Sequence, residues 1–151
     1  PKALPIGFRI ARMPALRPIM GLITPRSVIE RSLKQSVSNQ SVATSAEIDE
    51  YWELLRYPGN RDATGKRFAQ YGNRNAKTAV SDATRAIPAL ILWGNEDKLI
   101  PVSAVKWFQS VYSDNVAHIY KGIGHLPMEE SADKSAEDVG NWLNRARPSA
   151  N

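Results

Sequence analysis

The sequence predicts an α/β fold in which two parallel strands with flanking helices follow a long helical segment. Two observations support this prediction. Residues 87–151 alternate short apolar runs with amphipathic stretches in the order strand, helix, strand, helix, and such a unit makes the two strands parallel through a right-handed crossover. Residues 1–86 show helical periodicity instead. We therefore divide the chain into a helical segment, residues 1–86, and a strand-bearing segment, residues 87–151.

The first helix of the helical segment is predicted from its start signal. Thr24 stands at the N-cap position and Pro25 at the first helical position, which proline favours because its missing N–H is not needed there. The apolar residues that recur at helical spacing after this start are Val28, Ile29, Leu33 and Val37.

A second helix is predicted between clear start and stop signals. Thr44 and Glu47 form a capping box, and Pro58 with Gly59 ends the helix. Its apolar stripe consists of Ile48, Tyr51, Trp52 and Leu55. A third, weaker helix is expected over residues 62–71, followed by a turn in the sequence YGNRN.

Two strands are predicted in the second segment. The sequence ALILW, residues 89–93, is a short continuous apolar run, which is typical of a central parallel strand buried on both faces. The sequence VAHIY, residues 116–120, is predicted as its neighbour.

Amphipathic helices are predicted after each of these strands. The helix over residues 103–112 is expected to turn three residues inward: Val105, Phe108 and Val111. The helix over residues 131–145 is expected to pack through Val139, Trp142 and Leu143.

Composition excludes several classes of protein. The chain of 151 residues is 42% apolar, which fits one domain or part of a larger one. It has no cysteine and only two histidines without ligand spacing, so we expect no disulfide, no metal and no other cofactor. Arginines interrupt the apolar beginning, and no apolar run approaches a membrane span. We expect a soluble, cytoplasmic protein with no membrane partner.

The net charge of +5 is unevenly distributed. Residues 1–86 hold 14 Lys/Arg and 7 Asp/Glu residues, whereas residues 87–151 hold 6 and 8. The arginines are spread singly through helical patterns, with no run of like charge. They therefore indicate a solvated helical surface, and we expect no nucleic-acid partner.

Both strands end in a polar loop that carries a titratable side chain. Asp97 follows the first strand and His125 follows the second. Because ligands in α/β sheets bind at the carboxyl ends of the strands, we expect these loops to meet, with a carboxylate oxygen within about 3.5 Å of an imidazole nitrogen. Such an aspartate fixes the imidazole tautomer and leaves the other nitrogen as a general base. A glycine precedes His125 in GIGHLPMEE, and it allows a tight backbone turn there.

Each of the two residues has a simpler explanation when it is taken alone. An aspartate in the sequence NED is more often a turn former, and a single histidine is more often structural or exposed. Their joint position at two strand ends favours a catalytic pair. His118 lies inside the second strand pattern, so we expect it to have a packing or surface role.

The sequence IPALILWGNEDKLIPVSAVKWFQSVYSDNVAHIYKGIGHLPMEESADKSAEDVGNWL resembles the carboxy-terminal segment of α/β-hydrolase-fold enzymes, in which Gly-x-x-Asp follows one strand and Gly-His the next. Residues 1–86 resemble the helical cap that meta-cleavage-product hydrolases, epoxide hydrolases and haloalkane dehalogenases insert before it. The resemblance implies that Asp97 is the triad acid and His125 the triad base. Glu130 matches an acidic residue that often follows the histidine, and we interpret it as a helix-start residue without a catalytic role.

The family's nucleophile has no match in the sequence. It lies on Gly-x-Ser-x-Gly and precedes the acid and the histidine, but no serine or aspartate here has glycine two residues before and two after it. We therefore expect this chain to be the carboxy-terminal half of a hydrolase, with the nucleophile and early strands upstream. A two-stranded sheet exposes an open edge, which we expect to be covered by the missing half, by a second copy or by a rearranged sheet.

The resemblance implies that the complete protein hydrolyses an ester or related bond, while the isolated chain is inactive. The apolar residues beside the pair are expected to line the pocket for a small, largely apolar substrate: Leu99, Ile100 and Leu126. One alternative is an epoxide hydrolase or dehalogenase. Epoxide hydrolases use an aspartate nucleophile and cap tyrosines, but Tyr51 lies in a packing stripe. Another alternative is a non-catalytic interaction module derived from a hydrolase.

Overall fold

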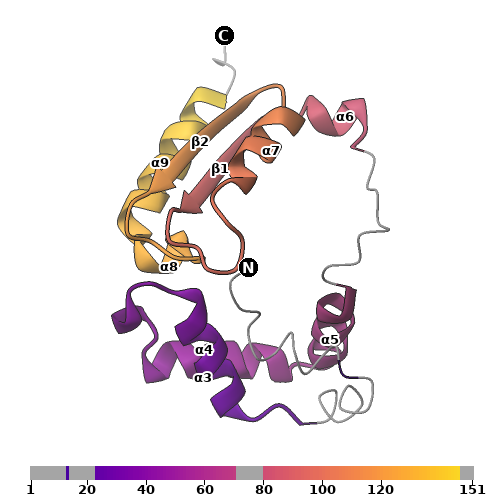
Figure 1. The fold of residues 1–151 in the computed structure, drawn as a ribbon, viewed down its shortest axis with the longest axis vertical. Helices are drawn as coiled ribbons and strands as arrows, with labels where there is room; N and C mark the ends of the chain where they lie inside the picture. The colour runs from indigo at the N-terminus through magenta and orange to yellow at the C-terminus, as the bar shows by residue number, and fades with distance from the viewer. Residues whose placement is uncertain (1–12, 14–22, 71–79, 147–151) are drawn as a thin grey trace.

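The computed structural model describes Met13, residues 23–70 and residues 80–146 (Figure 1). The turn expected in YGNRN lies outside these described residues. The elements follow one another as α3 (Arg26–Ser36), η1 (Gln40–Val42), α4 (Ser45–Arg56), α5 (Asn60–Gln70), α6 (Asp82–Arg85), β1 (Ala89–Gly94), α7 (Ala104–Val111), β2 (Asn115–Tyr120), α8 (Pro127–Glu130) and α9 (Ala132–Ala146). The predicted order of strand, helix, strand, helix is confirmed.

The sheet of the described residues consists of β1 and β2 in parallel. Its register pairs Ala89 with Asn115 and continues without interruption to Gly94 and Tyr120. The connection runs through α7, and α7 and α9 flank the sheet (Figure 1). Both strands therefore end at the same edge, where the predicted site residues follow.

The burial expected for β1 is only partly correct. Ile91 and Gly94 are buried, but the other residues of the strand are only half-buried. The reason is that β1 has a strand neighbour along one edge alone within the described part of the chain. A continuous apolar run indicates a central strand, and here the second neighbour and its covering layer are not among the described residues.

The helix α7 packs as predicted. Val105 and Val111 are buried and Phe108 is half-buried. Phe108 also contacts Trp93 of β1, with 5.6 Å between the ring centroids. The predicted inward face of this helix is therefore confirmed.

The face of α9 that packs on the sheet is only partly the predicted one. Trp142 is half-buried, in agreement with the prediction. Val139 and Leu143 are 37% and 48% exposed, whereas Ser135 and Asp138 are buried. The phenol of Tyr120 on β2 donates a hydrogen bond of 2.7 Å to Oδ2 of Asp138. Helical periodicity shows which residues share a face, but the partner decides which face is buried, and here a polar contact decides it.

The start of α3 differs by one residue from the prediction. Pro25, not Thr24, occupies the N-cap position, with extended backbone angles and no capping side-chain bond. The carbonyl oxygen of the buried Thr24 instead accepts a hydrogen bond of 2.9 Å from the indole of Trp52. A tertiary contact with α4 thus replaces the expected local cap.

The helices α4 and α5 lie close to their predicted positions. Thr44 caps α4 by accepting a hydrogen bond from the N–H of Glu47 at 3.2 Å, as predicted. The third predicted helix forms as α5, although it starts two residues earlier than expected. Within the described residues, no helix is long and apolar enough to cross a membrane.

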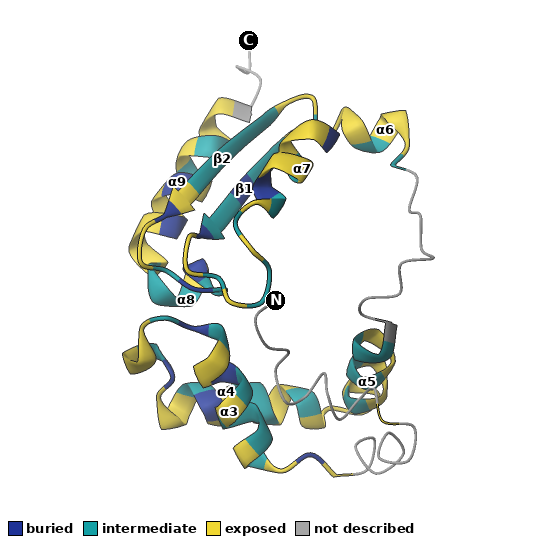
Figure 2. Ribbon diagram, in the orientation of Figure 1, coloured by how far each residue is buried: buried dark blue, intermediate teal, exposed yellow. Residues whose placement is uncertain are grey.

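The helical segment has a small core where α3 and α4 meet (Figure 2). Its largest fully buried side chain is Val37, which is 1% exposed. The other buried members are Leu33, Ala43 and Ile48. Several basic residues of the segment form ion pairs on the helix surface, among them Arg26–Asp49, Lys34–Glu30, Arg56–Glu53 and Lys66–Asp62. These pairs agree with a solvated helical surface.

Candidate active site

The loops that follow β1 and β2 are joined by hydrogen bonds. The N–H of Asn95 donates to the carbonyl of Tyr120, and the N–H of Glu96 donates to that of Ile123, both at 2.9 Å. The side-chain oxygen of Asn95 accepts a third bond, of 2.7 Å, from the N–H of Gly122. The two loops therefore form one hydrogen-bonded unit at the carboxyl edge of the sheet.

Asp97 and His125 meet across this unit. Oδ2 of Asp97 lies 2.8 Å from Nδ1 of His125. The Asp97 side chain is 3% exposed, whereas the His125 side chain is 31% exposed. The predicted approach of the two residues is confirmed, and their catalytic role stays a prediction.

Asp97 is held in one orientation by the backbone of its own loop. Its Oδ1 atom accepts hydrogen bonds from the N–H groups of Leu99 at 2.8 Å and Ile100 at 2.9 Å. Oδ2 is thereby left to face the imidazole. A carboxylate that accepts bonds at both oxygens is a fixed acceptor for an imidazole N–H.

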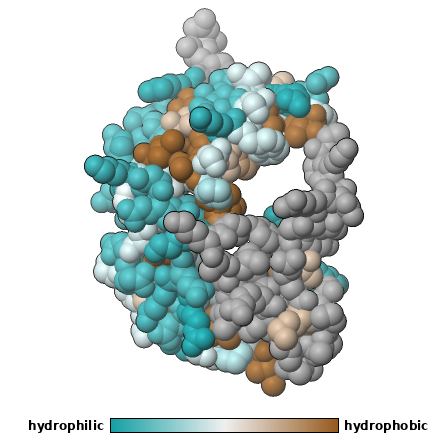
Figure 3. Space-filling view, viewed as in Figure 1, coloured by the Kyte–Doolittle hydropathy of each residue, from teal (hydrophilic) through white to brown (hydrophobic). Residues whose placement is uncertain are grey.

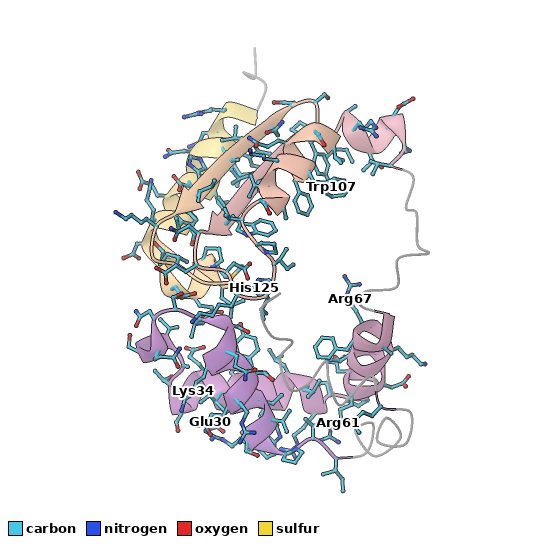
Figure 4. The ribbon with its side chains drawn as sticks, viewed as in Figure 1. Glu30, Lys34, Arg61, Arg67, Trp107 and His125 are labelled. Atoms are coloured by element: carbon cyan, nitrogen blue, oxygen red, sulfur yellow. The ribbon has the colours of Figure 1, made fainter. Side chains whose placement is uncertain are left out.

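This arrangement assigns the two ring nitrogens of His125. Nδ1 faces an acceptor, so we place the neutral ring's proton there, and Nε2 becomes the basic nitrogen. Within the described residues Nε2 has no hydrogen-bond partner. Figure 4 shows His125 in the loop between the strands and the helical segment. The ring is therefore oriented by Asp97 and presents a free base on its exposed side.

The predicted pocket residues have structural contacts of their own. Leu99 and Ile100 are half-buried and hold Asp97 through their backbones, and the carbonyl of Ile100 accepts a bond of 3.3 Å from the indole of Trp93. Leu126 packs against the core of the helical segment. A role of these three residues in lining a substrate pocket stays a prediction.

Glycines allow the two loops to approach each other. A Cβ atom on Gly94 would lie 2.0 Å from the carbonyl oxygen of Gly124, so no other residue fits there without backbone movement. Gly122 has a φ of +75° and makes the tight turn. The tight turn was expected at Gly124, but that residue has no positive φ. Gly124 is required because a Cβ there would lie 2.7 Å from the carbonyl oxygen of Ser36.

Comparison with family models finds no match. A curated 2-hydroxy-6-oxononadienedioate/2-hydroxy-6-oxononatrienedioate hydrolase from Klebsiella pneumoniae is 31% identical over 85 residues, which are 56% of this chain and 27% of that protein. The structure of a meta-cleavage product hydrolase from Pseudomonas fluorescens (CumD) matches 84% of this chain and 48% of its own, with a TM-score of 0.66 and 22% identity. The chain has the α/β-hydrolase fold over the part that it spans. An epoxide hydrolase, CorEH, matches the same α/β-hydrolase fold with a TM-score of 0.67 and 15% identity, over 93% of this chain and 49% of its own.

The chain spans only part of its α/β-hydrolase relatives. It covers less than a third of the curated relative's length and about half of each matched structure. The structural matches share the fold at low identity, so they place β1 and β2 within an α/β-hydrolase sheet without identifying a substrate. The predicted fold class and the resemblance to α/β-hydrolases are therefore confirmed.

Glu130 lies in the first turn of the four-residue helix α8, as its interpretation as a helix-start residue predicted. It also has a role that was not predicted. Its carboxylate accepts three backbone N–H bonds, from Gly124 at 2.8 Å, Ser38 at 2.7 Å and Asn39 at 2.8 Å. Sequence reasoning missed this contact, because Ser38 and Asn39 lie more than ninety residues earlier in the chain.

Tyr51 is used for packing, as its place in the stripe indicated. Its ring packs against the helical core, and its phenol donates a hydrogen bond of 3.0 Å to Oε1 of Glu129. Burial, aided by that bond, raises the pKa of Tyr51 to about 12. Two other tyrosines of the helical segment could be considered as the cap tyrosines of an epoxide hydrolase: Tyr57 is exposed, and Tyr71 lies outside the described residues. No group of three or more metal-ligating side chains is present among the described residues.

Proposed function

We propose that this chain supplies the cap and the acid–base pair of an α/β-hydrolase that cleaves an ester or related bond in a small, largely apolar substrate. The observation that carries this proposal is the 2.8 Å contact between Asp97 and His125, which leaves Nε2 free. The curated relative is named as a hydrolase of compounds that contain a 6-oxo group, which is a carbonyl open to nucleophilic attack. Those compounds are dicarboxylates, so the name supports attack on a carbonyl, and the proposed apolar character of the substrate rests on Leu99, Ile100 and Leu126 alone. The nucleophile itself comes from polypeptide outside this sequence.

His125 moves the proton in this proposal. Nε2 takes the proton from the nucleophile's hydroxyl as its oxygen attacks the substrate carbon, and then donates that proton to the leaving group. In the second step Nε2 takes a proton from water as the water oxygen attacks the covalent intermediate, and it then returns that proton to the oxygen of the nucleophile as the second product leaves. Asp97 accepts the Nδ1–H bond throughout and stabilises the imidazolium that forms.

The partner that supplies the nucleophile has a place to dock. A groove of about 360 Å³ runs along the free edge of β1, lined by residues 87–93, Phe108 and Tyr112. The N–H groups of Ala89 and Asn95 bond to the β2 side. Because backbone groups alternate sides along a strand, Leu90 and Leu92 turn theirs toward the groove. The groove thus offers hydrogen bonds at one wall and apolar side chains at the other.

We propose that a parallel strand from the nucleophile-bearing half of the hydrolase occupies this groove. The matched structures are about twice as long as this chain, so the remaining half has enough residues to supply it. Figure 3 shows apolar side chains exposed on the strand-bearing segment, and Ile87 and Trp107 are more than half exposed. In the absence of that half, we expect a second copy of this chain to take the same edge.

The test of the proposed activity compares the isolated chain with the chain joined to its upstream half. We expect the isolated chain to hydrolyse aryl esters no faster than background, because it has no positioned nucleophile. The joined protein is expected to be active and to lose roughly a thousandfold or more in kcat with His125→Ala. His118→Ala is the matched control and should keep that activity. Turnover by the pure isolated chain that His125→Ala abolishes would contradict the need for an outside nucleophile.

Epoxide hydrolysis is the second candidate, because CorEH has the same fold. Against it, Tyr51 is bound to Glu129 and packed in the helical core. The upstream nucleophile separates the two candidates, since an aspartate favours epoxide opening and a serine favours ester cleavage. A joined protein without hydrolase activity, despite an intact Asp97–His125 bond, would favour an interaction module.

A further inference from the structure

We propose that Glu130 is a positioning residue that holds His125 by joining the His125 loop to the helical segment. One carboxylate makes this joint. Oε1 accepts the N–H of Gly124, which precedes the histidine, and Oε2 accepts the N–H groups of Ser38 and Asn39 after α3. In Figure 1 this turn after α3 lies against α8, where the two segments meet.

A second bond completes the joint on the next residue. The N–H of His125 donates to the carbonyl oxygen of Ser36 at 2.8 Å. The N–H groups of Gly124 and His125 are therefore both fixed at the joint, while the ring of His125 is fixed by Asp97. His125 is therefore held at two points: its backbone N–H is bound by Ser36 and its ring Nδ1 by Asp97.

The chemistry of the joint requires a carboxylate. Three N–H donors converge on Glu130, and a carboxylate has two acceptor oxygens and no donor. A glutamine keeps one oxygen but turns its NH₂ group toward at least one of these donors. Bonds to an ionised acceptor are also stronger than neutral ones, so Glu130→Gln weakens all three bonds that residue 130 makes.

The adjacent residue provides a matched control. Glu129 also joins α8 to the helical segment, because its Oε1 accepts the phenol of Tyr51. Within the described residues, its side chain makes no hydrogen bond to Gly124 or His125. Glu129→Gln therefore weakens the attachment of the helical segment without changing the bond to Gly124. A comparison of the two variants shows whether Glu130 positions His125 or only attaches the helical segment to α8.

The inference rests on the proposed function only for what the position of His125 means in catalysis. Its test needs no substrate. Nuclear magnetic resonance of this chain, with ¹⁵N in the backbone and in the histidine rings, measures amide exchange and the Nδ1 and Nε2 signals together. His118 is the internal reference, because it lies on β2 away from the joint. A failure of the hydrolase proposal would leave this measurement unaffected.

We expect Glu130→Gln to speed amide exchange at Gly124, Ser38 and Asn39 by roughly tenfold or more, and to shift the ring signals of His125 but not of His118. Glu129→Gln should leave the three amides and the His125 ring unchanged. Faster amide exchange with unchanged His125 ring signals would overturn the proposal, because Glu130 would then only attach the helical segment. An equal His125 shift in both variants would overturn it as well.

A measurement on the unmodified chain covers the case in which Glu130→Gln does not fold. Native-state exchange in low denaturant gives the opening free energy of each amide. If the joint is one unit, then the amides of Gly124, His125, Ser38 and Asn39 open with the same free energy and the same denaturant dependence. Separate openings for the His125 loop and the turn after α3 would show that Glu130 does not couple them.

Discussion

Oδ2 of Asp97 accepts a hydrogen bond of 2.8 Å from Nδ1 of His125, although the crossover helix α7 lies between the two residues in the sequence. The contact forms because β1 and β2 are parallel neighbours and end at the same edge. A buried carboxylate thus faces a partly exposed ring, which is the asymmetry that a general base requires. The predictions below follow from this contact and from the packing that supports it.

Asp97→Asn should reverse the tautomer of His125. The asparagine oxygen can still accept the N–H groups of Leu99 and Ile100, which turns its NH₂ group toward Nδ1 and forces the ring proton onto Nε2. In the joined protein we expect kcat to fall by about four orders of magnitude, as in other triads with this change. Ring ¹⁵N shifts check the tautomer directly. Glu96→Gln, an exposed neighbour, is the control, and an unchanged Nδ1–H signal in Asp97→Asn would contradict the assignment.

The isolated chain should associate through β1. We expect light scattering to show a dimer or a larger assembly, because an open edge with a groove favours strand pairing. Leu92→Pro should give monomers, since proline cannot donate a hydrogen bond at the free edge and the bonds to β2 are made by other residues. Leu92→Ala removes similar apolar contact but keeps the N–H, and it is expected to associate. A stable monomer of the unmodified chain at high concentration would exclude this interface.

Acid should loosen α9 from the sheet through Asp138. Hydrogen bonds from Lys134 and Tyr120 lower the pKa of Asp138 in the folded state. A lowered carboxyl pKa stabilises the fold fully above the unfolded value of about 3.9, and this stability is lost as the pH falls through the folded value. Asp138→Asn should therefore lower the melting temperature at pH 7 and flatten its decline in acid. Asp133→Asn, at the exposed start of α9, is the matched control and should keep the melting temperature of the unmodified chain at pH 7.

Gly94→Ala should destabilise the joined loops strongly. The added Cβ would meet backbone atoms, including the carbonyl oxygens of Gly124 at 2.0 Å and Ile123 at 2.2 Å, and no side-chain rotation relieves these contacts. We expect a loss of about 3 kcal/mol or more in the free energy of unfolding, measured by denaturant titration. Gly65→Ala in α5 has no atom within 4 Å of the new Cβ and should be neutral or stabilising by about 0.5–1 kcal/mol. Equal effects in the two variants would show that the loops are not closely packed.

The sequence by itself determined the order of the two strands and the longer helices, and the meeting of Asp97 with His125; the short elements η1, α6 and α8 were not predicted. Apolar periodicity is local, so it locates β1, α7 and β2 within a few residues. The right-handed crossover then makes the strands neighbours, and their shared carboxyl edge brings the following loops together. No long-range information beyond these rules is needed for the pair.

Only the tertiary structure decided which groups surround the pair and which faces are buried. Glu130 binds the N–H groups of Ser38 and Asn39, and no local pattern links residues so far apart. Gly94 and Gly124 approach closely because two loops cross, which the spacing of glycines along the chain does not show. The buried side of α9 is set by the hydrogen bond between Tyr120 and Asp138. A helix that has both an apolar and a polar stripe can bury its polar stripe where the sheet provides hydrogen-bond partners for it.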